Sequence, residues 1–131
     1  MAGPRLAKLR RLLARWICWI AALVALVYLC NYLIDARLRM EKAPGCKWNT
    51  VPNSTKPSYS ARFCYLTKDR ALLRLDDAAG LHLLAERDFF EMDYPHFYWE
   101  ADALVYNDRH YDGGEIALPP TLIDRLRANL P

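Results

Sequence analysis

The hydrophobic pattern divides the chain into a long apolar run near the N-terminus and a remainder of short alternating segments. Residues 16–34 (WICWIAALVALVYLCNYLI) form nineteen positions without a charge, glycine or proline. As a helix rising about 1.5 Å per residue, the run would span roughly 28 Å, close to the hydrocarbon thickness of about 30 Å. Trp16 and Trp19 lie near one end and Tyr28 and Tyr32 near the other, as interfacial aromatic residues do. The pattern predicts one transmembrane helix.

The charges around this run predict its orientation. Residues 1–15 contain five basic residues and no acid, and the positive-inside rule places such a segment in the cytoplasm. Residues 35–131 would then lie across the membrane, although Arg37, Arg39 and Lys42 oppose this orientation. Arg outnumbers Lys thirteen to five, a hint of a GC-rich bacterial genome. We therefore expect the bacterial inner membrane, with the N-terminus cytoplasmic and the C-terminal domain periplasmic.

Other interpretations of the apolar run have less support. A cleaved signal peptide has an apolar region of about 7 to 15 residues and a small-x-small cleavage site. Here Ile34 lies two positions before Ala36, and Glu41 two positions before Ala43, so neither alanine completes such a site. The length of the run disfavours the buried helix of a soluble protein. A mitochondrial presequence remains open, because residues 5–16 are Arg-rich, acid-poor and amphipathic.

Residues 35–60 are predicted to form a juxtamembrane region and a linker, because they include three prolines and many small polar residues. Cys46 and Cys64 are the two cysteines beyond the apolar run, separated by 17 intervening residues. In an oxidising compartment we expect them to form a disulfide, which contributes about 3 kcal/mol in the chain-entropy model. A metal or redox pair is the alternative, but no C-x-x-C and no nearby His support it. Cys18 and Cys30 lie in the run and are expected to be inert.

Residues 61–131 are predicted to form a small β-rich extracytoplasmic domain. Runs of β-branched, aromatic and aliphatic residues between turn-like segments predict antiparallel strands at 61–67, 70–76, 81–86 and 115–118. Leu and Ala also leave a helix open for residues 70–90. The clearest alternation is that of residues 96–106, which predicts one half-buried strand. Its apolar face would comprise Phe97, Trp99, Ala101, Ala103 and Val105, and its more polar face Tyr98, Glu100, Asp102, Leu104 and Tyr106.

The chain ends in a predicted amphipathic helix. Its apolar face would comprise Leu122, Ile123, Leu126 and Leu130. Asp124 precedes Arg125 and Arg127, as the helix dipole prefers. We expect this helix to lie across one face of the sheet. The predicted fold class is therefore α+β, with one N-terminal transmembrane helix, a small antiparallel β-sheet domain and a C-terminal amphipathic helix.

The charge distribution disfavours nucleic-acid binding. Residues 1–42 contain eight Lys/Arg and two Asp/Glu, a net charge of +6, whereas the other 89 residues contain ten and thirteen, a net charge of −3. A basic arm before an apolar run is typical of membrane topology. A mildly acidic domain is a poor ligand for a phosphate backbone. We expect membrane lipid to be the partner of the N-terminal helix.

No reaction signature emerges from the remaining motifs. The three histidines are in no zinc spacing, and no Ser or Cys lies in a nucleophile-elbow or Cys–His context. Acid pairs on the predicted strand 96–106 would allow general acid–base chemistry, but such pairs are mostly solvated surface. We therefore expect a binding protein without a cofactor rather than an enzyme.

The loop at residues 108–115 carries the alternative function, a small periplasmic hydrolase or metal-binding protein. Asp108, His110 and Asp112 fall at the first, third and fifth positions of a calcium-loop pattern. The pattern then fails, because Pro119 stands where the bidentate Glu belongs. A hairpin turn explains the same residues without a metal.

An aromatic-rich stretch is the candidate partner-binding surface. Tyr94, His96 and Tyr98 alternate there with Phe97 and Trp99, which we expect to lie in the core. Tyr and Trp are enriched in interface hot spots, although the tyrosines would also serve to cover a sheet edge. We therefore expect a single-pass, membrane-anchored protein-interaction module outside the cytoplasm. Envelope-complex subunits, accessory proteins and immunity-type proteins share this architecture, which is an analogy only.

Overall fold

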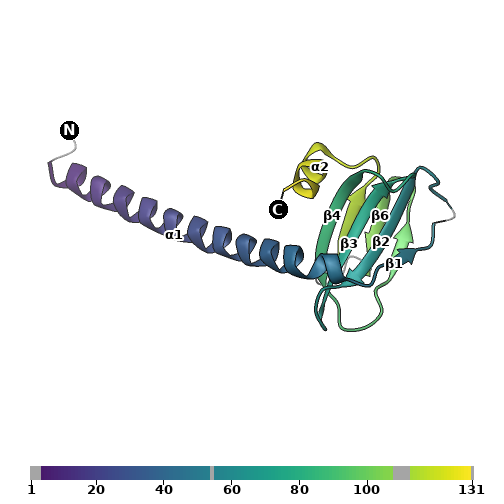
Figure 1. Cartoon of the computed structure of the whole chain (residues 1–131). Helices are drawn as coiled ribbons and strands as arrows, with labels where there is room; N and C mark the ends of the chain where they lie inside the picture. Colours follow the sequence, from purple (N-terminus) through teal and green to yellow (C-terminus); the bar gives the residue numbers. More distant parts are fainter. Residues whose placement is uncertain (1–3, 54, 108–112, 131) are drawn as a thin grey trace. The chain divides into compact units, whose positions relative to one another are not determined.

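The chain folds into two units. The structure, a computed structural model, describes residues 4–53, 55–107 and 113–130 (Figure 1). Met1–Arg37 form a helical unit, and Leu38–Pro131 form a compact unit with two antiparallel sheets and a short C-terminal helix. The α+β class predicted from the sequence is confirmed.

The N-terminal unit consists of the long helix α1 (Pro4–Lys42), whose last residues belong to the compact unit. The helix runs without interruption through residues 16–34, where no glycine or proline weakens it. It is long and apolar enough to cross a membrane, and no side chain in its most apolar window is buried. A core helix of a soluble protein would bury these side chains.

Seven strands in the described part of the chain form two antiparallel sheets. The four-stranded sheet has the order β1 (Asn49–Val51), β2 (Tyr59–Tyr65), β3 (Arg70–Asp77) and β4 (Leu83–Phe90). The three-stranded sheet has the order β5 (Phe97–Trp99), β6 (Ala103–Tyr106) and β7 (Gly114–Ala117). Residues 70–90 are therefore strands, as predicted, and the helical alternative is excluded.

The two sheets share one core (Figure 1). Phe63, Leu73 and Leu75 of the four-stranded sheet cluster with Leu104 and Ile116 of the three-stranded sheet, and each is at most 1% exposed. We call the face of the four-stranded sheet that contributes to this core its inner face, and the opposite face its outer face. Two layers over one core explain how so short a chain buries large side chains.

The prediction of one strand over residues 96–106 is wrong. β5 and β6 are two strands of a hairpin, paired antiparallel around a turn at residues 100–102. Leu104, on the predicted polar face, is fully buried, whereas Ala101, on the predicted apolar face, is exposed. Alternation continues through the turn, so the sequence pattern does not reveal where the chain folds back.

The segment before β2 is part of the compact unit. β1 pairs with β2, and a 3-10 turn, η1 (Ala43–Gly45), follows α1. Ala43 and Trp48 pack on the outer face of the sheet against Cys64 and Leu72. The polar, proline-rich composition of this segment is compatible with an extended linker or an irregular lead-in strand, and its few apolar residues are enough to attach it to the sheet.

The C-terminal helix α2 (Leu122–Ala128) exists as predicted, but its expected packing is wrong. The four residues of the predicted apolar face are 57% to 78% exposed, while Asp124 is 5% exposed. They are Leu122, Ile123 and Leu126 of the helix and Leu130 just after it. The Asp124 carboxylate pairs with Arg87 of β4. A guanidinium at this position requires a counterion when it is shielded from water, and this requirement turns the polar side of the helix toward the sheet.

Candidate functional site

The three residues predicted to contact a partner line one groove of about 290 Å³. Val51 and Pro52 line the groove as well. β1, which contains Val51, and β5, which contains Tyr98, are edge strands of their sheets. The tyrosine groove, as we call it, therefore includes residues from an edge strand of each sheet.

Aromatic rings form the floor of the groove. The ring of Phe63, which is 1% exposed, lies 5.0 Å from that of Phe97 and 5.7 Å from that of Tyr94, between centroids. The Tyr94 ring is perpendicular to it, an edge-to-face arrangement that aromatic pairs favour. Tyr94 and Tyr98 are 68% and 48% exposed. The groove thus combines an apolar floor with accessible phenol groups.

Hydrogen bonds fix the segment that carries the tyrosines. The Trp99 indole Nε1 donates to the Pro52 carbonyl at 2.9 Å, and the Tyr65 hydroxyl donates to the Asp93 carbonyl at 2.7 Å. Pro95 between them is fully buried. Because both ends of the segment are held, little ordering entropy is lost when a ligand binds there.

The surroundings of the groove are acidic. Burial raises the pKa of the Tyr65 phenol above its usual value, and the charges of Glu91, Tyr94 and Asp93 raise it further. Tyr65 therefore remains a hydrogen-bond donor at neutral pH. A groove in an acidic domain attracts positively charged ligands.

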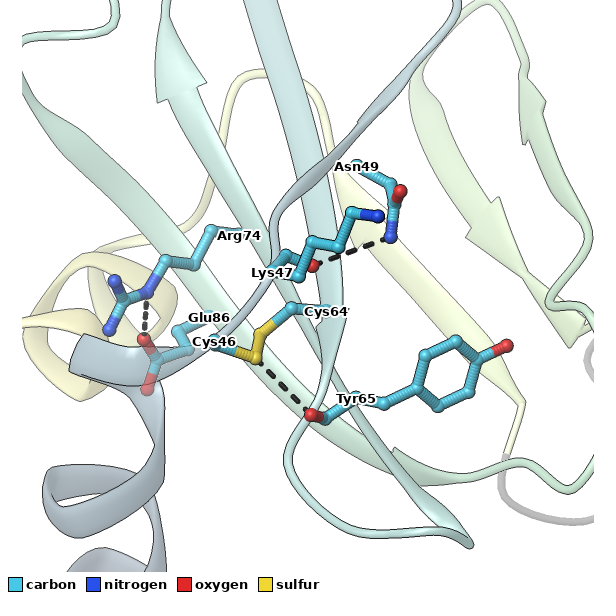
Figure 2. Close-up of a disulfide and its surroundings, with 7 residues drawn as sticks. All are labelled: Cys46, Lys47, Asn49, Cys64, Tyr65, Arg74 and Glu86. Atoms are coloured by element: carbon cyan, nitrogen blue, oxygen red, sulfur yellow. Dashed lines mark hydrogen bonds and ion pairs between the residues drawn. A yellow bond between two sulfur atoms is a disulfide. The ribbon is translucent and has the colours of Figure 1, made fainter.

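The predicted cysteine pair lies at disulfide distance on the outer face (Figure 2). The sulfur atoms of Cys46 and Cys64 are 2.05 Å apart and their Cα atoms 6.0 Å apart, within the usual range of about 4.4 to 6.8 Å. Cys46 Sγ also lies 3.3 Å from the Tyr65 carbonyl, a contact only, because a disulfide sulfur carries no proton. Cys18 and Cys30 are free and exposed.

Charged residues beside the disulfide are mutually paired. The Trp48 ring lies 5.1 Å from the Arg62 guanidinium and 4.8 Å from that of Arg74, and Arg74 Nε lies 2.6 Å from Glu86 (Figure 2). Burial raises the pKa of Asp76, although Arg62, 2.9 Å away, opposes the shift. These contacts bind the residues after η1 to the sheet, which is a structural role.

The metal hypothesis falls on residues that the structure does not describe. Asp108, His110 and Asp112 all lie in the gap between residues 107 and 113. In the described ranges, no group of three or more His, Cys, Asp or Glu is placed to hold a metal ion. The metal site stays a prediction, to be tested by metal analysis of the protein and its His110→Ala variant.

Sequence reasoning missed three of the residues that line the groove. Val51, Pro52 and Phe63 precede the tyrosine segment by thirty residues or more, and they meet it only because the sheets stack. No local pattern contains that information. Comparison with known proteins adds no further constraint, since no family model, curated protein or solved structure matches the chain.

Proposed function

We propose that the chain is a single-pass membrane protein whose compact unit lies outside the cytoplasm. Three observations support this. The apolar window of α1 has no buried side chain, five basic residues and no acid precede residues 16–34, and Cys46 and Cys64 are at disulfide distance. Disulfides persist in exported compartments, and the positive-inside rule gives the same orientation. The proposed location is the bacterial inner membrane, with the compact unit in the periplasm.

The proposed activity is binding of another protein in the tyrosine groove. The observation that carries it is the grouping of exposed Tyr94, His96 and Tyr98 over an apolar floor. Tyr side chains supply large contact area and a hydrogen-bonding tip. The adjacent edge strands suit an extended segment that adds to a sheet, and the acidic surroundings favour one that is basic. An envelope-complex, accessory or immunity-type role is consistent with such a module.

The topology is tested by fusing reporters to the C-terminus of the full chain. Alkaline phosphatase is active only after export, so its fusion should be active in whole cells. A green fluorescent protein fusion of the type that matures only in the cytoplasm should stay dark. The reverse pattern would place the compact unit in the cytoplasm and remove the case for the disulfide.

The binding site is tested by photocrosslinking in intact cells. A photoreactive amino acid at Tyr98 of the full chain should yield a discrete adduct with another protein. The matched control is Leu81, an exposed residue between β3 and β4, where the same probe should yield none. Tyr94→Ala should weaken the Tyr98 adduct. An adduct from Leu81 alone, or none from Tyr98 under conditions where the chain is abundant and folded, would count against the groove.

A further inference from the structure

Helix α2 presents its apolar side to solvent and its polar side to the protein. The exposed side comprises Leu122, Ile123 and Leu126, and Leu130 just beyond the helix is exposed as well. Asp124, the acid of the helix, is 5% exposed. Exposing several aliphatic side chains together is unfavourable in water, and such a surface is typical of a contact site.

The orientation of α2 is fixed by its buried carboxylate. Asp124 accepts hydrogen bonds from the Thr121 amide at 3.0 Å and hydroxyl at 2.8 Å, while its own amide donates back to the Thr121 hydroxyl, forming a capping box. Its other oxygen pairs with Arg87 of β4. Rolling the leucines inward would turn Asp124 away from Arg87 and break this ion pair. The outward apolar side is therefore a fixed property of the compact unit.

The charge on the exposed side is exclusively positive. Asp124 is directed inward, whereas Arg125 and Arg127 are exposed next to the aliphatic residues. An apolar strip flanked by arginines is the pattern of helices that lie in the interface of anionic membranes. Basic residues near such a surface each contribute about 1 kcal/mol of attraction. A second copy could also cover the leucines with its own α2, but pairing the two helices would bring the arginines of both copies together, and such like-charge contacts are unfavourable.

Few residues separate the end of the proposed membrane span from the depression that the end of α2 lines. Leu130 and Ala128 line the same depression as Arg39 and Met40, all within the compact unit. Met40 follows Ile34, the last residue of the apolar run, by six positions. Six residues reach at most about 21 Å when extended. The chain between the apolar run and this depression is therefore short.

We propose that α2 is an interfacial anchor that lies on the anionic leaflet from which α1 emerges. Its aliphatic residues insert at the boundary of headgroups and acyl chains, and Arg125 and Arg127 bind anionic headgroups. The contact orients the compact unit relative to the membrane. This inference rests on the proposed crossing of the membrane by α1.

The test uses the full chain in lipid nanodiscs, with Cys18→Ala and Cys30→Ala so that one introduced cysteine is the reactive thiol. A polarity-sensitive fluorophore is attached at Leu126→Cys and, separately, at Val24→Cys in α1 and at Leu81→Cys. With brominated lipids in discs rich in phosphatidylglycerol, we expect quenching at positions 126 and 24 and none at 81. Quenching at 126 should fall in phosphatidylcholine discs and in the Arg125→Gln, Arg127→Gln variant, while quenching at 24 should not change.

The outcomes separate the two proposals. Quenching at position 24 without quenching at position 126 would overturn the α2 anchor and leave the membrane span intact. Absence of quenching at position 24 would show that α1 is not inserted and would overturn both. If position 126 is shielded only when two labelled chains share a disc, α2 binds a second copy and the lipid proposal is wrong. Ile123→Cys repeats the measurement should Leu126→Cys disturb the fold.

Discussion

The inner and outer faces of the four-stranded sheet are stabilised by different means. The inner face is apolar and meets a second sheet, with Leu73 and Leu75 of β3 fully buried. The outer face meets η1 and the segment after it, held by the Cys46–Cys64 pair and by the Trp48 ring near two arginines. Arg39 of α1 also pairs there with Glu86 and Asp88. Burial stabilises the inner face under any redox condition. The outer face owes part of its stability to a bond that depends on the compartment.

The largest effect is expected on the inner face. Leu73→Ala should lower the free energy of unfolding by about 2 to 5 kcal/mol, because it leaves a cavity at a fully buried site. Chemical denaturation of the full chain in detergent measures the change. Leu81→Ala, at an exposed site, is the control and should have little effect. A cost for Leu73→Ala no larger than that of its control would show that the sheets do not share a packed core.

The next largest effect is expected from the disulfide. Cys46→Ser should cost about 3 kcal/mol by restoring entropy to the unfolded chain, and a reducing agent should have the same effect on the wild type. Cys30→Ala, which removes a free and exposed thiol, should leave the unfolding midpoint unchanged. Full labelling of Cys46 and Cys64 by a thiol reagent in the non-reduced protein would contradict the bridge.

The disulfide also provides a way to separate the two faces. Leu72 and Leu73 are adjacent and both fully buried, but Leu72 packs on the outer face next to Cys64. Groups that share contacts show non-additive effects on stability, whereas independent groups do not. The cost of Leu72→Ala should therefore change in the Cys46→Ser background, and the cost of Leu73→Ala should not. Equal coupling at both positions would mean that the faces are not independent.

Much of this architecture could be predicted from the sequence, and the exceptions share a cause. The apolar run, the strands at residues 61–86 and the short C-terminal helix follow from local periodicity. The turn at residues 100–102 does not, because Ala101 and Leu104 keep the alternation through it. The orientation of α2 does not follow from local periodicity either, since the pairing of Asp124 with a residue of β4 is a contact across 37 positions.

The same physics determines what the sequence could reveal about the tyrosine groove. Tyr94 and Tyr98 were singled out from composition, because exposed aromatic residues are informative wherever they occur. Phe63 and Pro52 were not, because their role depends on how the two sheets stack. Local pattern therefore pointed to the exposed tyrosines of the groove and missed the lining residues that come from the other sheet.

A smaller effect is expected from the ion pair between Arg87 and Asp124. Arg87 is the position at which the inner face is no longer apolar. Asp124→Asn should cost about 1 to 2 kcal/mol, since it removes a charged hydrogen-bond partner of Arg87 and weakens the capping box. Burial raises the pKa of Asp124, but hydrogen bonds from Thr121 and Arg87 outweigh it and leave the pKa lowered. The carboxylate therefore stabilises the fold above the unfolded pKa of about 3.9, and this contribution is lost as the pH falls through the lower folded value.

Acid titration of stability tests this assignment. Between neutral pH and pH values below the unfolded pKa, the wild type should lose more stability than Asp124→Asn. Asp76 is the matched control. Because burial raises its pKa, its contribution to stability changes with pH in the opposite direction. Its contribution favours the fold at acid pH and declines as the pH rises through the unfolded and then the folded pKa. Identical acid profiles for the wild type and Asp124→Asn would show that this carboxylate is not a stabilising charge.

An effect no larger than that of Asp124→Asn is expected from the cation–π contacts on the outer face. Trp48→Leu retains apolar contact with the cluster around Cys64 but removes the aromatic face beneath Arg62 and Arg74. Partly exposed contacts of this kind contribute about 0.5 to 1 kcal/mol each, so the loss should be about 1 to 2 kcal/mol. Trp48→Phe, which keeps a π face, should lose less, and Arg74→Met should cost less in the Trp48→Leu background than in the wild type. If Phe and Leu are equally destabilising, the ring serves only as apolar cover, and the outer face depends on the disulfide and its small buried cluster alone.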